Sequence, residues 1–149
     1  MVLVTFWGLL MEFEVRVYNV LISVGETATP LVLGTPLPRH LLSSSDLGVD
    51  TGSSDLWVVS DKCTHGCSSG QSAYPQASFQ YSGADAELLY GDSTSGTAAL
   101  GMIGKDTVTL AGLTLQDQYF VAVNQTNTTL GQTGSSGIFG LGFPVGRYV

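Results

Sequence analysis

The chain has 149 residues, which is long enough for one domain with a hydrophobic core. Charged residues make up only 11%, and five Lys and Arg against twelve Asp and Glu give a net charge of −7 at pH 7. This balance argues against nucleic acid as a partner, which needs a basic face. It suits a protein that works in acid, where surface carboxylates lose charge and repel one another less.

The composition predicts an all-β protein. Nineteen glycines, many serines and threonines and few helix-forming residues are typical of short strands joined by turns. No internal repeat, long linker or charge run is visible, so we expect one main domain.

The amino terminus is apolar up to Met11, and Glu12 and Glu14 stop this apolar run well short of a membrane span. The run is compatible with a signal-peptide remnant, but it lacks a basic start and an A-x-A-like cleavage site. A first strand or a frayed terminus is the alternative. We therefore separate residues 1–12, as an amino-terminal extension or signal remnant, from a main domain over residues 13–149.

The first strands of the main domain follow this extension. Alternation within residues 13–24 predicts a strand, with Phe13 and Val15 on one face and charged residues on the other. Gly-Glu-Thr at residues 25–27 predicts a turn, and an apolar run begins a second strand at Pro30. Residues 34–48 interrupt this second strand with two prolines and a run of serines, which a central strand does not tolerate.

The stretch Asp-Thr-Gly-Ser-Ser-Asp-Leu-Trp at residues 50–57 is the most specific motif in the chain. Asp50 heads a turn, and Gly52 is able to take the positive φ that a sharp reversal requires. The surrounding hydroxyls and N–H groups would keep the Asp50 carboxylate ionised at low pH. Leu-Trp-Val-Val at residues 56–59 predicts a buried strand behind the turn. A bare Asp-Thr-Gly would be explained by an aspartate that caps its own turn, but eight specified residues are far less expected by chance.

A β pattern continues after this motif. Residues 86–90 and 96–101 predict the two arms of a hairpin around a glycine-rich tip at residues 91–95. Residues 105–110 and 118–123 predict further strands.

Three motifs together resemble the pepsin-like aspartic proteases. The motif at residues 50–57 resembles their first active-site motif, with Asp50 on the catalytic aspartate. Tyr-Gly-Asp-Ser at residues 90–93 is similar to the flap that closes over substrate, and its Asp-Ser pair is closer to fungal members than to animal pepsins. Gly-Ile-Phe-Gly-Leu-Gly at residues 137–142 is similar to the segment that threads beneath the catalytic turn. The motifs occur in family order, so the resemblance implies an amino-terminal lobe of this family.

The resemblance implies an acid endopeptidase that needs no metal or organic cofactor. In this family two aspartates share one proton and a water: one activates the water, and the other protonates the carbonyl oxygen of the peptide bond. In this chain Asp50 would be one of them. Gly52 would shape its turn, Ser53 would hydrogen-bond its carboxylate, and Thr51 would lock the turn to its counterpart in the other lobe.

The resemblance also assigns the flap. Tyr90 would lie over the scissile bond with its hydroxyl tethered to the indole N–H of Trp57. The backbone groups of Gly91 and Asp92 would bind an extended peptide substrate by β-pairing. Outside these motifs, Tyr90 and Trp57 would be explained as core aromatics.

Cys63 and Cys67 stand where the family often has a small disulfide loop, which an oxidising compartment permits. A metal site formed with His65 is the alternative, but it needs a fourth ligand and lacks the C-x₂-C pairs of zinc ribbons. Two N-x-T sequons, at Asn124 and Asn127, are candidate glycosylation sites and suggest the secretory route. We therefore expect a secreted protein or one in an acidic, vacuole-like compartment.

Two explanations account for residues 34–48. Joining Leu33 directly to Val49 would restore an uninterrupted, family-like strand into Asp50. We therefore favour an exposed, poorly ordered insertion, such as an unspliced intron that keeps the reading frame. The alternative is that Gly-Thr-Pro at residues 34–36 is the approach that commonly precedes the family's catalytic strand, with a few extra residues behind it.

The chain departs from the family pattern at one decisive point. No second Asp-Thr-Gly or Asp-Ser-Gly occurs in its 149 residues, so the sequence supplies one lobe and half of a catalytic pair. The missing carboxy-terminal lobe is therefore an expected partner, and the chain alone is expected to be inactive. The alternatives are a catalytically silent or peptide-binding derivative, and a homodimer in which each copy contributes Asp50, as in retroviral proteases.

Overall fold

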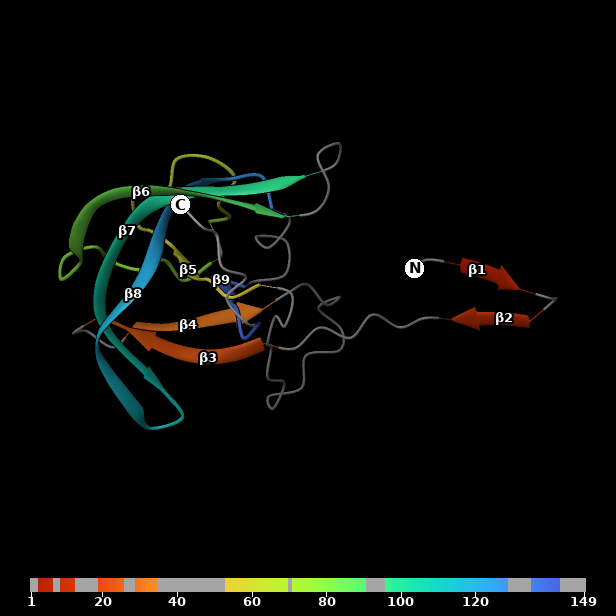
Figure 1. Ribbon diagram of the computed structural model, residues 1–149, viewed down its shortest axis with the longest axis horizontal. Helices are drawn as coiled ribbons and strands as arrows, with labels where there is room; N and C mark the ends of the chain where they lie inside the picture. The colour runs from red at the N-terminus through yellow and green to blue at the C-terminus, as the bar shows by residue number, and fades with distance from the viewer. Residues whose placement is uncertain are drawn as a thin grey trace.

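The computed structural model describes residues 3–6, 9–12, 19–25, 29–34, 53–69, 71–90, 96–128 and 135–142. All regular elements in these ranges are β-strands, so the all-β prediction is confirmed (Figure 1). No helix in the described ranges is long and apolar enough to span a membrane. The strands are β1 (Leu3–Phe6), β2 (Leu9–Glu12), β3 (Asn19–Val24), β4 (Thr29–Gly34), β5 (Leu56–Val59), β6 (Gln80–Tyr90), β7 (Thr97–Leu110), β8 (Leu113–Thr126) and β9 (Gly137–Phe139).

The first two strands form a small sheet of their own. β1 pairs antiparallel with β2, with Leu3 opposite Glu12 and Phe6 opposite Leu9. This hairpin lies apart from the larger sheet in Figure 1. Where the sequence offered a single first strand as one interpretation, the amino-terminal extension contains two short paired strands.

The other strands form one sheet in the order β3-β4-β9-β5-β8-β7-β6. β3 also pairs with β7. The strands β3, β4, β9, β5, β8 and β7 therefore close into a ring, and β6 pairs with β7 outside this ring. The long strands β6, β7 and β8 curve over β3, β4, β5 and β9 (Figure 1). β9 pairs parallel with β4, and β5 pairs parallel with β8, whereas the remaining pairs are antiparallel.

Most strands run further than the sequence indicated. The two hairpin arms belong to β6 and β7, and β7 continues without a break through residues 105–110, which looked like a separate strand. Register shifts after Leu100 and after Asp106 mark irregularities of the ladder between β7 and β8. Such bulges bend a strand and break its alternation, so one long strand resembles two short ones in the sequence.

The strands nearest the Asp50 turn are described only in part. The strand predicted within residues 13–24 is described from Asn19 onward, as β3. β4 begins at Thr29 and ends at Gly34, which pairs with Asn19. Gly34 is thus the end of a strand, and the rest of the suspected insertion, residues 35–48, lies outside the described residues.

The hydrophobic core covers both faces of β5. Leu56 and Val58 belong to one cluster, which includes Phe120, whereas Trp57 and Val59 belong to a second one. Successive side chains of a strand point to opposite faces, so a strand buried at every position is covered on both sides. The sequence prediction of a buried strand at residues 56–59 is therefore confirmed.

Candidate active site

The Asp50 turn lies outside the described residues, together with Thr51 and Gly52. The structure describes the strands on either side of it: β4 up to Gly34, and β5 together with the residues just before it, from Ser53. The site is therefore defined by the segments that flank and support the turn.

β9 lies between the two strands that flank the turn. Leu33 of β4 pairs in parallel with Gly137, and on the other side Leu56 pairs antiparallel with Phe139. A segment from far along the chain thus separates the strand that leads toward Asp50 from the strand that follows it. The family resemblance implied that residues 137–142 thread beneath the Asp50 turn, and this stays a prediction because the turn lies outside the described residues.

The segment after β9 also binds the backbone that leaves the turn. The N–H of Gly142 donates a 2.7 Å hydrogen bond to the carbonyl oxygen of Ser53, and the N–H of Gly140 donates one of 3.0 Å to Asp55. A Cβ atom at Gly140 would lie 2.6 Å from the Ser53 oxygen and from the Asp55 nitrogen. Only glycine permits this approach. The two backbone bonds hold Ser53 and Asp55, which lie just before β5.

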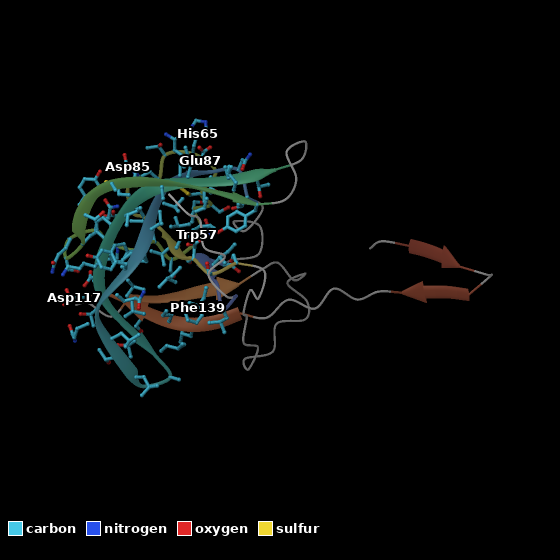
Figure 2. The ribbon with its side chains drawn as sticks, viewed as in Figure 1. Trp57, His65, Asp85, Glu87, Asp117 and Phe139 are labelled. Carbon is cyan, nitrogen blue, oxygen red and sulfur yellow. A yellow bond between two sulfur atoms is a disulfide. The ribbon has the colours of Figure 1, made fainter. Side chains whose placement is uncertain are left out.

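Trp57 of β5 and Tyr90 of β6 meet although their strands are not neighbours in the sheet. The indole Nε1–H of Trp57 donates a 2.8 Å hydrogen bond to the hydroxyl of Tyr90, the last residue of β6. The Trp57 side chain is fully buried, and the Tyr90 ring packs against the same cluster. Figure 2 shows Trp57 and Phe139 among the strands, with His65 and Asp85 at the outer edge. Gly91 and Asp92, which follow Tyr90, lie outside the described residues.

Cys63 and Cys67 form a disulfide, with their Cα atoms 6.3 Å apart. Sulfurs that bond to each other are not available as thiolate ligands, which argues against a metal site formed by Cys63, His65 and Cys67. The loop docks on the end of β8: the N–H of Thr64 donates to the carbonyl oxygen of Asn124, and the N–H of Thr126 donates to that of His65.

The two candidate glycosylation residues differ in exposure. Asn124 lies within β8 and is partly buried, whereas Asn127 follows the end of β8 and is exposed. Asn124 lies beside the disulfide loop, because its carbonyl oxygen accepts a hydrogen bond from the N–H of Thr64. Asn127 lies beside the hairpin of β6 and β7, because its side chain accepts one from the N–H of Ala98.

A buried polar network around Asp106 was missed from the sequence. The Asp106 carboxylate accepts 2.6 Å hydrogen bonds from the hydroxyls of Tyr74 and Ser78, and a 2.7 Å bond from the N–H of Thr107. Burial raises the pKa of Tyr74, and the hydrogen bond and charge of Asp106 raise it further. The only sequence signal was one carboxylate in a strand, which normally indicates a solvent-facing position.

An apolar cavity of about 580 Å³, lined by residues of β3 and of β5 to β9, was also missed. It reaches Asp55, next to the segment that leaves the Asp50 turn. Three of its leucines are exposed by more than half: Leu113 by 75%, Leu115 by 58% and Leu141 by 51%. In the sequence these leucines look like ordinary strand or loop residues, because exposure of single apolar residues is common.

The family follows from comparison with known proteins. The model of the family described as eukaryotic aspartyl protease matches residues 28–148. The chain belongs to the eukaryotic aspartyl protease family. The match includes the Asp50 turn, the β6–β7 hairpin and residues 137–142, so the family resemblance of the sequence is confirmed.

Fungal members of the aspartyl protease family are among the similar proteins. The chain is 41% identical over 100 residues to rhizopuspepsin-4 of Rhizopus niveus, which covers 65% of this chain and 24% of that protein. It is 34% identical over 121 residues to penicillopepsin-1 of Penicillium roqueforti, which covers 79% and 28%. The solved aspartic proteinase of Irpex lacteus matches with a TM-score of 0.55 and 25% identity, over 80% of this chain and 26% of that one. The chain therefore spans about a quarter of the length of these relatives, which is consistent with a single aspartyl protease lobe.

Proposed function

We propose that this chain supplies one half of the active site of an aspartic endopeptidase, with Asp50 as one of two catalytic carboxylates. The observation that carries the proposal is the placement of β9 between β4 and β5. This placement and the backbone bonds to Ser53 and Asp55 hold the described residues just before β5 in a fixed geometry. Catalysis by a positioned carboxylate depends on such a rigid support.

The proposed reaction is the hydrolysis of a peptide bond at acid pH. One carboxylate takes a proton from a water molecule, whose oxygen attacks the carbonyl carbon, and the other carboxylic acid donates a proton to the carbonyl oxygen. Two close carboxylates do not both ionise, so the pair shares one proton in acid. Asp50 provides one member, and a carboxy-terminal lobe provides the other. The relatives, about four times as long as the matched segment, support this division.

The residues around Asp50 have supporting roles in this proposal. Thr51 and Gly52 shape the turn and its contact with the second lobe, and the Ser53 hydroxyl binds the Asp50 carboxylate. The carbonyl group of Ser53 is already fixed by Gly142.

The end of the β6–β7 hairpin would hold the substrate. Tyr90 closes over an extended peptide, and the backbone groups of Gly91 and Asp92 pair with it. The hydrogen bond from Trp57 supports this role, because it sets the orientation of the Tyr90 ring from a fully buried side chain.

The proposed location is the secretory route, leading outside the cell or to an acidic compartment. The disulfide between Cys63 and Cys67 supports this proposal, because such bonds persist in oxidising compartments. Within the chain, residues 13–149 would form the lobe, residues 1–12 an extension and residues 34–48 an insertion.

A chimera tests the proposed function. The chain is joined to the part of rhizopuspepsin-4 that follows the matched segment, and cleavage of an unfolded protein is measured at acid pH with and without pepstatin. We expect pepstatin-sensitive cleavage that Asp50→Asn lowers by at least about 100-fold, because the amide does not accept the proton of the water. Asp117→Asn, at an exposed carboxylate, is the matched control.

Two outcomes would contradict the proposal. A folded chimera that binds pepstatin without cleaving would indicate a silent, peptide-binding lobe. Cleavage by the chain alone that rises with the square of its concentration would indicate a homodimer with two Asp50 side chains.

A further inference from the structure

The two sequons follow each other directly, at residues 124–126 and 127–129, but their asparagines have different surroundings. Asn124 is a partly buried residue of β8, and Asn127 is exposed just beyond the end of that strand. Thr129 completes the second sequon in the sequence and lies outside the described residues. The structure thus allows the two asparagines to be compared as carriers of a glycan.

The side chain of Asn127 is oriented by Ala98 of β7. Its Oδ1 accepts a 2.6 Å hydrogen bond from the N–H of Ala98, and the N–H of Asn127 donates to the Ala98 carbonyl oxygen at 3.2 Å. The hydroxyl of Thr126 donates to the same oxygen at 2.9 Å. Because Oδ1 faces Ala98, the Nδ2 on the same carbon points away from it. An N-linked sugar attaches to that nitrogen and leaves the bond from Ala98 to Oδ1 intact.

Asn124 is held in a different way. Its Oδ1 is buried without a hydrogen-bond partner among the described residues. Its backbone oxygen accepts from the N–H of Thr64 at 2.9 Å, and the N–H of Thr126 donates to His65 at 3.0 Å. Gly66 packs so closely that a Cβ there would overlap the carbonyl oxygen of Thr126. The disulfide loop therefore covers the backbone of this sequon, and a glycan on Asn124 would have to leave from a half-buried strand position.

We propose that Asn127 carries an N-linked oligosaccharide and that Asn124 does not. The inference depends on the secretory route proposed above. The donor is an oligosaccharide on a lipid pyrophosphate: Nδ2 bonds to the anomeric carbon, the bond from that carbon to the pyrophosphate oxygen breaks, and the amide nitrogen loses one proton. Ala98 pairs with Leu89, next to Tyr90, so the glycan stands beside the hairpin that carries Tyr90.

Site mapping tests the proposal. The full chain is expressed in yeast behind a cleavable foreign signal peptide, so that its own targeting does not affect the result. Secreted and membrane-retained chains are both treated with N-glycanase in heavy-oxygen water, which marks each formerly glycosylated asparagine as a labelled aspartate. We expect the label at Asn127 alone. It should persist in Asn124→Gln and be absent in Asn127→Gln and in Thr129→Val. Label at Asn124 in the parent chain, loss of all label in Asn124→Gln, or an unlabelled Asn127 would overturn the proposal.

Hydrogen exchange of the Ala98 amide tests the orientation independently. Thr129→Val removes the sequon but keeps Asn127, so protection of the Ala98 amide should be unchanged. Asn127→Gln should speed this exchange by about tenfold, the factor for loss of one hydrogen bond. Equal exchange in both variants would refute the assigned orientation. Neither readout involves proteolysis, so failure here would leave the role of Asp50 untouched, and an inactive chimera would leave the glycan site untouched.

Discussion

The indole N–H of Trp57 donates a 2.8 Å hydrogen bond to the hydroxyl of Tyr90 and thereby joins β5 to the end of β6. β5 follows the Asp50 turn in the chain, and Tyr90 precedes the tip of the β6–β7 hairpin. The completely buried Trp57 side chain thus connects β5, the strand that follows the Asp50 turn, to the proposed flap.

Tyr90→Phe should separate the positioning role of this bond from the chemistry. Removal of the hydroxyl leaves the buried indole N–H without its acceptor, which costs about 1–3 kcal/mol. In the chimera we expect kcat/KM to fall by roughly tenfold while Asp50-dependent, pepstatin-sensitive cleavage remains. Urea unfolding followed by tryptophan fluorescence gives the stability, and Tyr119→Phe, at an exposed tyrosine, is the control. A Tyr90→Phe protein with parental stability would show that the bond contributes nothing.

Gly140→Ala should destabilise the segment that leaves the Asp50 turn. The added methyl would lie 2.6 Å from backbone atoms of Ser53 and Asp55, and relief of such overlap typically costs about 1–3 kcal/mol. Gly112→Ala is a useful comparison, because nothing lies within 4 Å of that methyl and only the positive φ is strained. Urea midpoints of both variants measure the difference. If Gly140→Ala lost no more stability than Gly112→Ala, the close approach would not be a constraint.

Removal of the disulfide should have a modest effect on stability. Closure of so short a loop contributes about 2 kcal/mol in the chain-entropy model. The double variant Cys63→Ala, Cys67→Ala should therefore unfold at lower urea, and reduction of the parent chain should have the same effect. His65→Ala should not, because the loop binds β8 through the His65 backbone. A double variant as stable as the oxidised parent would contradict the expectation.

Tyr74→Phe should flatten the loss of stability at alkaline pH. The fold raises the pKa of Tyr74 above its ordinary value of 10.0, so the fold favours the neutral phenol. The neutral phenol therefore contributes to the free energy of unfolding, fully below pH 10 and less and less as pH rises toward the pKa of the folded state. Between about pH 8 and 11 the parent chain should lose more stability in urea than Tyr74→Phe, with Tyr119→Phe as control. Equal losses would contradict the assignment. At pH 8 the variant should already be less stable by about 1.5–3 kcal/mol, because the bond to Asp106 is gone.

Local patterns predicted the strands and motifs of this chain better than its long-range contacts. Four apolar residues in a row at β5 are sufficient to predict a buried strand, whereas nothing local indicates that β9 inserts between β4 and β5. The family resemblance predicted only that residues 137–142 thread beneath the Asp50 turn, and it did not name the strands with which they pair. Asp106 was missed for a related reason: its burial depends on hydroxyls from Tyr74 and Ser78, about thirty residues away in the chain.

The last prediction is that the chain alone is not an efficient protease. The proposed mechanism needs two carboxylates close enough to share a proton, and a single Asp50 among hydroxyl donors would ionise and leave no acid for the carbonyl oxygen. The apolar cavity and the exposed leucines, Leu113, Leu115 and Leu141, would also favour aggregation or pairing of isolated chains.

Purified chain on an unfolded protein substrate at acid pH, with a concentration series and a pepstatin control, measures this activity. Self-pairing offers one way for two Asp50 side chains to meet, and its signature is activity that rises faster than linearly with concentration. A surface shaped for a different, covalently linked lobe need not be complementary to itself, so we expect no such rise. Pepstatin-blocked turnover that is linear in protein concentration, from a species that sedimentation shows to be monomeric, would mean that one lobe suffices and that the requirement for a second carboxylate is wrong.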